Sequence, residues 1–159
     1  MKLTSIERDA RLNATSAFFT TTYRWLLRAT SGAEENLQIQ RKIIGGLKAY
    51  ATLRADLKRG CLLPPLVLAA KGVSSRLDQD VNELQESIET IEPADVYIID
   101  GLQRTNAIRQ TARELDGEEL EQFLNRPLRV EVWLNIPFGA LAYRMLLLNA
   151  GQRPMSIKH

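Results

Sequence analysis

The sequence predicts an α/β (α+β) domain in which a small mixed sheet is flanked by helices. Some segments carry apolar residues at helical spacing, others carry them alternately or in short continuous runs, and the two kinds follow one another along the chain. The length of 159 residues is within the usual range of one domain and is enough to bury a core without disulfides.

The first part of the chain gives two ambiguous segments and one clear helix. Residues 1–15 have a few apolar positions at helical spacing and are expected to form a short, weakly held opening helix. Residues 16–30 are rich in threonine and aromatics, which favours a strand, although their four-residue spacings also suit a helix. Residues 34–60 predict an amphipathic helix that is weakened at two adjacent glycines and stops at Gly60.

The later segments have plainer patterns. They predict a buried strand entered through two prolines (62–70), a polar loop (71–79), a helix (81–91), a strand (96–99) with a helix from near Thr105, a short helix (118–124), a strand (129–134) and a helix opened by proline (137–148). Residues 1–36 are expected to be an N-terminal extension that contributes a strand to the sheet. Residues 37–159 are expected to form the main domain, truncated at its C-terminus.

Composition excludes several kinds of enzyme. Cys61 is the only cysteine and His159 the only histidine, so the chain cannot assemble an intramolecular disulfide, a Cys/His zinc cluster or a conventional Ser-His-Asp triad. The sequence shows no secretory signal, lipidation motif or membrane-length apolar run. We therefore expect a cytoplasmic protein that has no membrane partner.

The net charge of +2 is too small to indicate nucleic-acid binding by itself. Six basic residues nevertheless fall within one segment: Arg41, Lys42, Lys48, Arg54, Lys58 and Arg59. A solvated helix face explains them better than a surface that faces DNA. Three large aromatic residues are likewise expected in the core rather than stacked on bases: Trp25, Trp133 and Tyr143.

The turn between the strand at 96–99 and the next helix is the strongest candidate site. It reads Asp-Gly-Leu-Gln-Arg-Thr over residues 100–105. Gly101 permits a tight turn, the free amides of the helix start favour an anion, and Arg104 offers a planar fork of donors for a phosphate. An ordinary strand-to-helix connection in which Arg104 pairs with Asp100 is the alternative.

Three segments, in this order, resemble a known family. The Gly-x-Leu-x-Pro-Pro-Leu-Val-Leu pattern at residues 60–68 resembles the strand opening of ParB-like proteins, and residues 100–105 resemble an Asp-Gly-Gln-His/Gln-Arg signature. Residues 148–156 resemble a later Ile-Asn-x-x-Gln-x-Pro-x-Ser segment. Together they resemble the DGQHR-domain family, which includes DndB-type proteins, within the ParB/sulfiredoxin-like superfamily. The chain departs from the signature at Leu102, where a polar residue is usual.

The resemblance implies roles for particular residues. It implies catalytic roles for Asp100, Gln103 and Arg104, phosphate or nucleotide binding by Gly101, Arg104, Thr105, Asn149 and Gln152, and a metal ligand at Asp100. The implied cofactors are a nucleoside triphosphate of the ATP or CTP class and magnesium. Leu102 puts catalysis in more doubt than binding, and a helix cap is an equally good interpretation of Asn149.

The resemblance also implies a function in DNA modification or restriction. The chain is expected to bind nucleotide or DNA phosphate, either as a metal-dependent NTPase or nuclease of a phage-defence system, or as a non-catalytic DNA-binding regulator of DndB type. A structural module of a larger complex is a third interpretation. The expected partners are DNA, a nucleotide and other proteins of such a system, and a homo-oligomer is left open.

Overall fold

The computed structural model describes residues 1–32, 46–73 and 80–137, together with 139, 140 and 143. Within these residues the fold is mixed α/β, with a five-stranded mixed sheet and five α-helices. The strands are β1 (Lys2–Asp9), β2 (Ala14–Thr22), β3 (Leu66–Ala70), β4 (Val96–Asp100) and β5 (Pro127–Leu134). The helices are α1 (Tyr23–Ala29), α2 (Gly46–Lys58), α3 (Val81–Glu89), α4 (Leu102–Arg113) and α5 (Gly117–Leu124), and a short 3-10 helix spans Pro93–Asp95.

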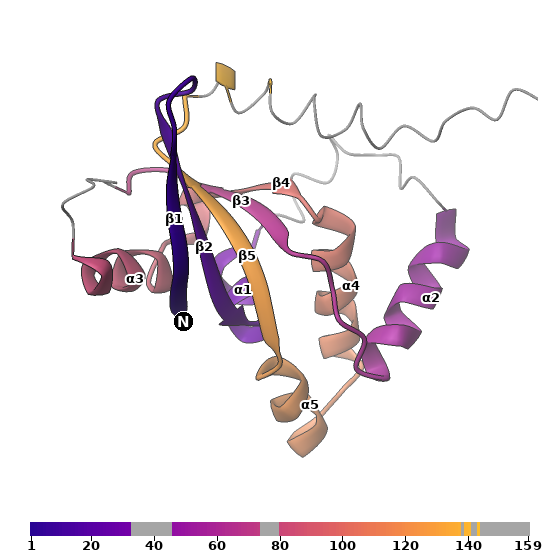
Figure 1. The fold of residues 1–159 in the computed structure, drawn as a ribbon. Coiled ribbons are helices and arrows are strands. Elements are labelled where there is room, and N and C mark those ends of the chain that lie inside the picture. Colours follow the sequence, from indigo (N-terminus) through magenta and orange to yellow (C-terminus); the bar gives the residue numbers. More distant parts are fainter. Residues whose placement is uncertain (33–45, 74–79, 138, 141–142, 144–159) are drawn as a thin grey trace, which may run out of the picture.

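The strands lie side by side in the order β1-β2-β5-β3-β4 (Figure 1). All neighbouring pairs are antiparallel except β3 and β5, which run parallel. The register places Thr22 beside Pro127, Leu66 beside Val130, and Asp100 beside Val67. The C-terminal ends of β2 and β4 and the N-terminal ends of β3 and β5 therefore lie at the same end of the sheet, which we call the Asp100 end.

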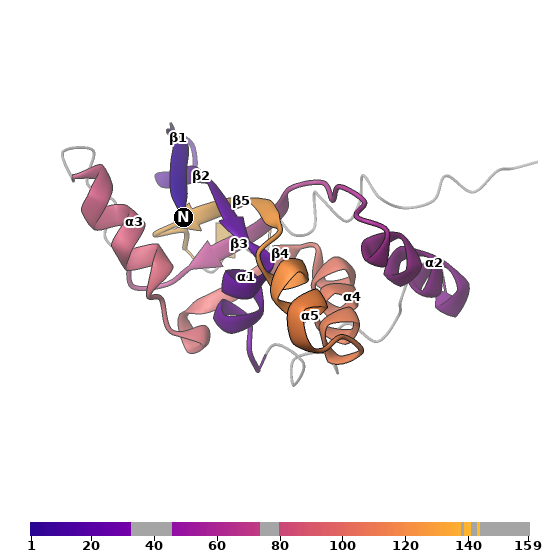
Figure 2. The same cartoon turned by 90° about the horizontal axis from the view of Figure 1, so that it is seen from below.

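Helices α1, α4 and α5 cover one face of the sheet, and α2 packs beside α4 (Figure 2). The main core lies between these helices and the sheet, and its buried side chains come from β2, β3 and β5 as well as from the helices. Leu66, Val130 and Ile108 are fully buried there. A smaller cluster that contains Ala69, Ile99 and Trp133 lies apart from the main core.

The expected opening helix at residues 1–15 is wrong, because residues 2–9 form strand β1, which is antiparallel to β2. The expected strand at 16–30 is correct only as far as Thr22. There the hydroxyl of Thr22 accepts a hydrogen bond from the Trp25 amide at 3.3 Å, and this cap starts helix α1. The spacing of buried residues from Tyr23 to Ala29 is then helical.

The remaining predictions fit better. The strands and helices predicted after residue 60 are confirmed wherever they are described, with α4 beginning at Leu102 rather than near Thr105. Gly60, which follows the end of α2 at Lys58, has a left-handed φ of +88°, a conformation typical of a glycine just after a helix. Residues 33–45, 74–79 and most of the predicted helix at 137–148 lie outside the described residues. The division of the chain at residue 36 stays a prediction, although β2 lies within the same sheet as β3, β4 and β5.

Candidate functional site

The turn from Asp100 to Thr105 joins β4 to α4 at the Asp100 end of the sheet. Gly101 adopts a left-handed φ of +104°, which only glycine adopts without strain. A Cβ at this position would lie 2.8 Å from Leu66 Cγ and 3.3 Å from Arg104 Nη2. The glycine is therefore needed because the side chains of Leu66 and Arg104 occupy the space beside it.

Arg104 is held by three acceptors inside the protein. Its Nη2 donates to Asp100 Oδ2 at 2.9 Å, and its Nη1 donates to the carbonyl of Pro64 at 2.9 Å and that of Pro65 at 3.3 Å. The side chains of Arg104 and Asp100 are only 18% and 25% exposed. The guanidinium thus fastens the start of α4 to the segment that leads into β3.

Thr105 is buried, and its hydroxyl donates to the Gly101 carbonyl at 2.9 Å. The backbone amide of Thr105 donates to the same carbonyl. The amides of residues 102–104 precede this first helical bond, and Gly101 has no side chain that could accept from them. The helix start therefore retains the donors and the positive dipole end that suit an anion.

The structure brings together Asp100, Gly101, Gln103, Arg104 and Thr105, which are five of the predicted site residues. Asn149 and Gln152 lie outside the described residues, and so does the segment at 148–156. The alternative ion pair between Arg104 and Asp100 is present. These side chains therefore have an internal structural role, whatever ligand they also bind.

The described residues do not provide a ligand set for magnesium at Asp100. Its carboxylate pairs with Arg104, and the described ranges contain no group of three or more His, Cys, Asp and Glu side chains that could hold a metal. Hard divalent cations prefer several oxygen ligands. The magnesium site stays a prediction of the resemblance, and no step proposed below passes through it.

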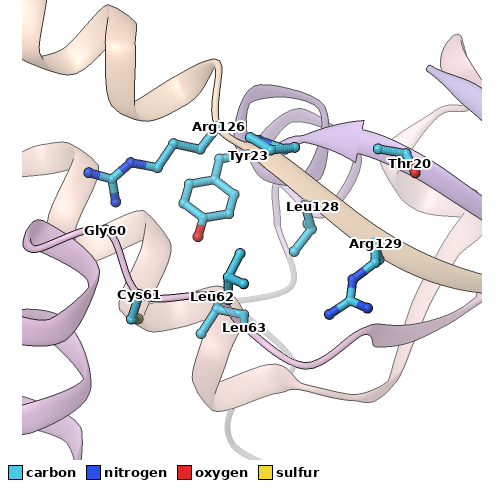
Figure 3. A pocket seen from close by; sticks show the side chains of 10 residues that line it. Thr20, Tyr23, Gly60, Cys61, Leu62, Leu63, Arg126, Leu128 and Arg129 are labelled. Carbon is cyan, nitrogen blue, oxygen red and sulfur yellow. The ribbon is translucent and has the colours of Figure 1, made fainter.

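A pocket of about 460 Å³ also lies at the Asp100 end, between the start of β5 and residues 60–63 (Figure 3). Its lining includes Tyr23, Cys61, Leu62, Arg126 and Arg129. Sequence patterns missed these residues as a group because they come from separate segments. A local signal exists only for Arg129, which is on the polar side of the alternating strand 129–134.

The ionisable groups of this pocket are shifted mainly by burial. Burial raises the pKa of the Tyr23 hydroxyl, while the charge of Arg126 opposes this shift. Burial also raises the pKa of the Cys61 thiol, the Asp56 carboxylate adds to this shift, and Arg126 again opposes it. Both groups are therefore neutral near pH 7, and Cys61 is not activated as a nucleophile.

The other sequence-based assignments have mixed outcomes. Trp25 and Trp133 are buried as expected, but Tyr143 is 44% exposed and lies near Arg11, so its expected core position is wrong. Arg54 and Lys58 pair with Glu114 at the C-terminal end of α4, so these two residues of the basic segment contact a neighbouring helix and are not simply part of a solvated face. Arg41 and Lys42 lie outside the described residues.

No family model, curated protein or solved structure matches this chain. Among the helices of the described residues, none combines the length and the apolar character that crossing a membrane requires.

Proposed function

We propose that the protein binds a phosphate-bearing ligand, either a nucleotide or the DNA backbone, at the Asp100 end of the sheet, and that it acts in DNA modification or restriction. The finer fold assignment, a ParB/sulfiredoxin-like domain with a DGQHR-type turn, belongs to the same proposal. Its support is the resemblance of the three ordered segments, together with the mixed sheet and the position of the turn at a strand-to-helix junction.

One observation carries the proposal: residues 60–65 connect two features that favour an anion. Residues 60–63 line the pocket that contains Arg126 and Arg129. The carbonyls of Pro64 and Pro65 hold Arg104 beside the start of α4. Arg126 and Arg129 in the pocket, together with Arg104 and the N-terminus of α4, thus lie at one end of the sheet, where each favours an anion.

The residues have different roles in this proposal. The amides of residues 102–104 donate to phosphate oxygens, and the left-handed backbone of Gly101 forms the turn that precedes them. Arg104 contacts phosphate when the ligand replaces the Asp100 carboxylate as its partner, because both are oxyanions that accept from the same guanidinium. Thr105 supports the turn through its bond to Gly101. Asn149 and Gln152 stay part of the proposal through the resemblance alone.

A second candidate is a binding protein that breaks no bond, such as a DndB-type regulator. Two observations favour it over a nuclease or NTPase. The Asp100 carboxylate, the predicted metal ligand, already pairs with Arg104 at 2.9 Å, and Leu102 has replaced the polar residue of the signature. A structural module is the third candidate, and it requires that no phosphate bind.

A thermal-shift experiment separates the three candidates. The melting temperature is measured with inorganic triphosphate, with nucleoside triphosphates and with a short DNA duplex, each with and without Mg²⁺. A ligand that binds the folded state must raise it. Arg104→Lys is expected to reduce the ligand-induced shift, because lysine keeps the charge but lacks the planar fork of donors. Lys71→Gln removes an exposed cation away from the turn and is expected to leave the shift unchanged.

The outcomes are distinct. A shift with nucleotide together with release of inorganic phosphate, or a shift with DNA together with cleavage of the duplex, supports the enzyme. Salt-sensitive binding of DNA or nucleotide with neither phosphate release nor cleavage supports the regulator. If no phosphate ligand changes the melting temperature, the binding proposal is wrong and only the structural module remains.

A further inference from the structure

The pocket at the start of β5 has a guanidinium group at each end (Figure 3). Arg126 extends toward Gly60 and Cys61, whereas Arg129 lies on the other side, near Leu63. Tyr23 and Leu128 project between them from the opposite wall. The pocket is therefore an apolar recess with a positive charge at both ends.

The two arginines differ in what they already contact. Arg126 donates to the carbonyl of Leu57 at the end of α2, and its guanidinium carbon lies 5.0 Å from the centre of the Phe123 ring. Arg129 is exposed on β5, and within the part of the chain that the structure describes it has neither a hydrogen bond nor an ion pair through its side chain. Arg129 is thus the cation that an incoming group can engage without displacing another partner.

The surface between the arginines is apolar. Leu62 is 84% exposed, which is high for a leucine, while Leu63 and Leu128 are buried behind it. Tyr23 also lines the pocket although it is almost fully buried, and Thr20 contributes a hydroxyl on the side of Arg129. An apolar group that covered Leu62 would remove its surface from water, which is favourable.

We infer that this pocket binds a small organic anion, namely a carboxylate or a phosphate monoester on an apolar body, with the acid group on Arg129 and the body against Leu62. The basis is charge complementarity beside an exposed apolar surface in a recess of about 460 Å³. This inference goes beyond the proposed function, because it gives the ligand an apolar body that lies against Leu62 and does not require a phosphate at Gly101.

Three matched compounds test the inference by titration calorimetry: naphthoate, naphthyl phosphate and the uncharged naphthalenemethanol. We expect at least one of the two acids to bind the protein about tenfold more tightly than the alcohol, since a charge-assisted hydrogen bond contributes that much or more. The two acids distinguish a carboxylate ligand from a phosphate ligand. Arg129→Gln is expected to remove the advantage of the acid while leaving the affinity for the alcohol unchanged.

Two further variants locate the binding energy. Leu62→Ser is expected to weaken all three compounds, because it removes the apolar surface that they share. Lys71→Gln removes one positive charge near the opposite end of β3 and is expected to change none of the affinities. Melting temperatures of the variants show whether each one is folded.

Cys61 reports whether the compounds bind in this pocket. It lines the pocket and is the only cysteine of the chain, so the mass of the intact protein follows its alkylation by iodoacetamide. The preferred acid is expected to slow alkylation in the wild type and not in Arg129→Gln at the same concentration.

Three results would overturn the inference: equal affinity for acid and alcohol in the wild type, an unchanged preference in Arg129→Gln, or binding without protection of Cys61. None of them contradicts phosphate binding at the turn, because inorganic triphosphate, which has no apolar body, tests that binding separately.

Discussion

Gly101 shows how one residue without a side chain supports the whole turn. Two independent features require glycine here: the left-handed φ of +104°, and the 2.8 Å that would separate a Cβ from Leu66 Cγ. At Gly72 only the backbone requires glycine, because its φ is +76° and no atom lies within 4 Å of a Cβ built there. The pair therefore separates backbone strain from steric crowding.

We predict that Gly101→Ala lowers the free energy of unfolding by about 2 to 5 kcal/mol, the sum of about 1 to 2 for the left-handed backbone and about 1 to 3 for overpacking. Gly72→Ala is expected to show only the backbone part. Urea denaturation of both variants measures the difference. Equal losses would show that Leu66 and Arg104 move aside freely, against the close packing described above.

Cys61 gives a prediction about pH. Its folded pKa is raised, first by burial and then by the charge of Asp56, so the thiol form is favoured in the native protein. The thiol therefore contributes to the free energy of unfolding. This contribution is fully present below the pKa of the unfolded thiol and is lost as the pH rises through the folded pKa. Asp56→Asn is expected to lower the pH midpoint of iodoacetamide alkylation, with Asp95→Asn as the control. No change in the midpoint would contradict the influence of Asp56.

At the scale of elements, arginine side chains hold the ends of helices. At the C-terminal end of α3, Arg28 donates to the carbonyls of Glu89 and Ile91. At the C-terminal end of α1, Arg109 donates to the carbonyls of Leu27 and Thr30. At the end of α2, Arg126 donates to the carbonyl of Leu57. Cations at these positions satisfy carbonyls that the helix leaves unpaired and oppose the negative dipole end. Several basic residues that would otherwise count toward nucleic-acid binding therefore have structural roles.

Helix α1 carries a matched pair of arginines that tests this role. Arg28 bonds to backbone carbonyls, whereas Arg24 forms an exposed ion pair with Glu121 at 2.6 Å. We predict that Arg28→Ala lowers the free energy of unfolding by about 1 to 3 kcal/mol, since it leaves the carbonyl of Ile91, at a partly buried hydrogen bond, without its donor. Arg24→Ala is expected to lower it by less than about 1 kcal/mol. The opposite order would refute the structural role of Arg28.

The elements that the sequence predicted well are those whose signals are local. Strand β3 follows its own proline-led apolar run, and α3 and α5 follow their own periodicity. Strand β1 has no such signal. Six of its eight residues are exposed, and it is a strand because β2 pairs with it, so its identity depends on the sheet rather than on its own residues.

The same distinction applies to the candidate site. The turn at 100–105 is contiguous in sequence, and its position between β4 and α4 was predicted correctly. The engagement of Arg104 by Pro64 and Pro65 was not, because it depends on the register between β3 and β4. Tyr23, Arg126 and Arg129 meet only after β2 and β5 have paired.

At the scale of the whole molecule, strand β2 lies between β1 and β5, and its side chains help to build the main core. Phe19 is 1% exposed and Leu26, on the following helix, is fully buried. A chain that starts at residue 37 would lose both and would leave β5 without its antiparallel partner. We predict that residues 37–159 alone do not unfold cooperatively on heating, as measured by circular dichroism. A cooperative transition would instead support an independent domain after residue 36.

The central claim is that the Asp100 end of the sheet binds phosphate. A titration with inorganic triphosphate, followed by the NMR chemical shifts of the backbone amides, tests this claim most directly. We predict saturable shifts that are largest at residues 101–104, because the first amides of α4 are the proposed phosphate donors. The shifts are expected to be smaller in Arg104→Lys and unchanged in Lys71→Gln. An absence of saturable shifts at residues 101–104, with or without shifts elsewhere, would contradict the account.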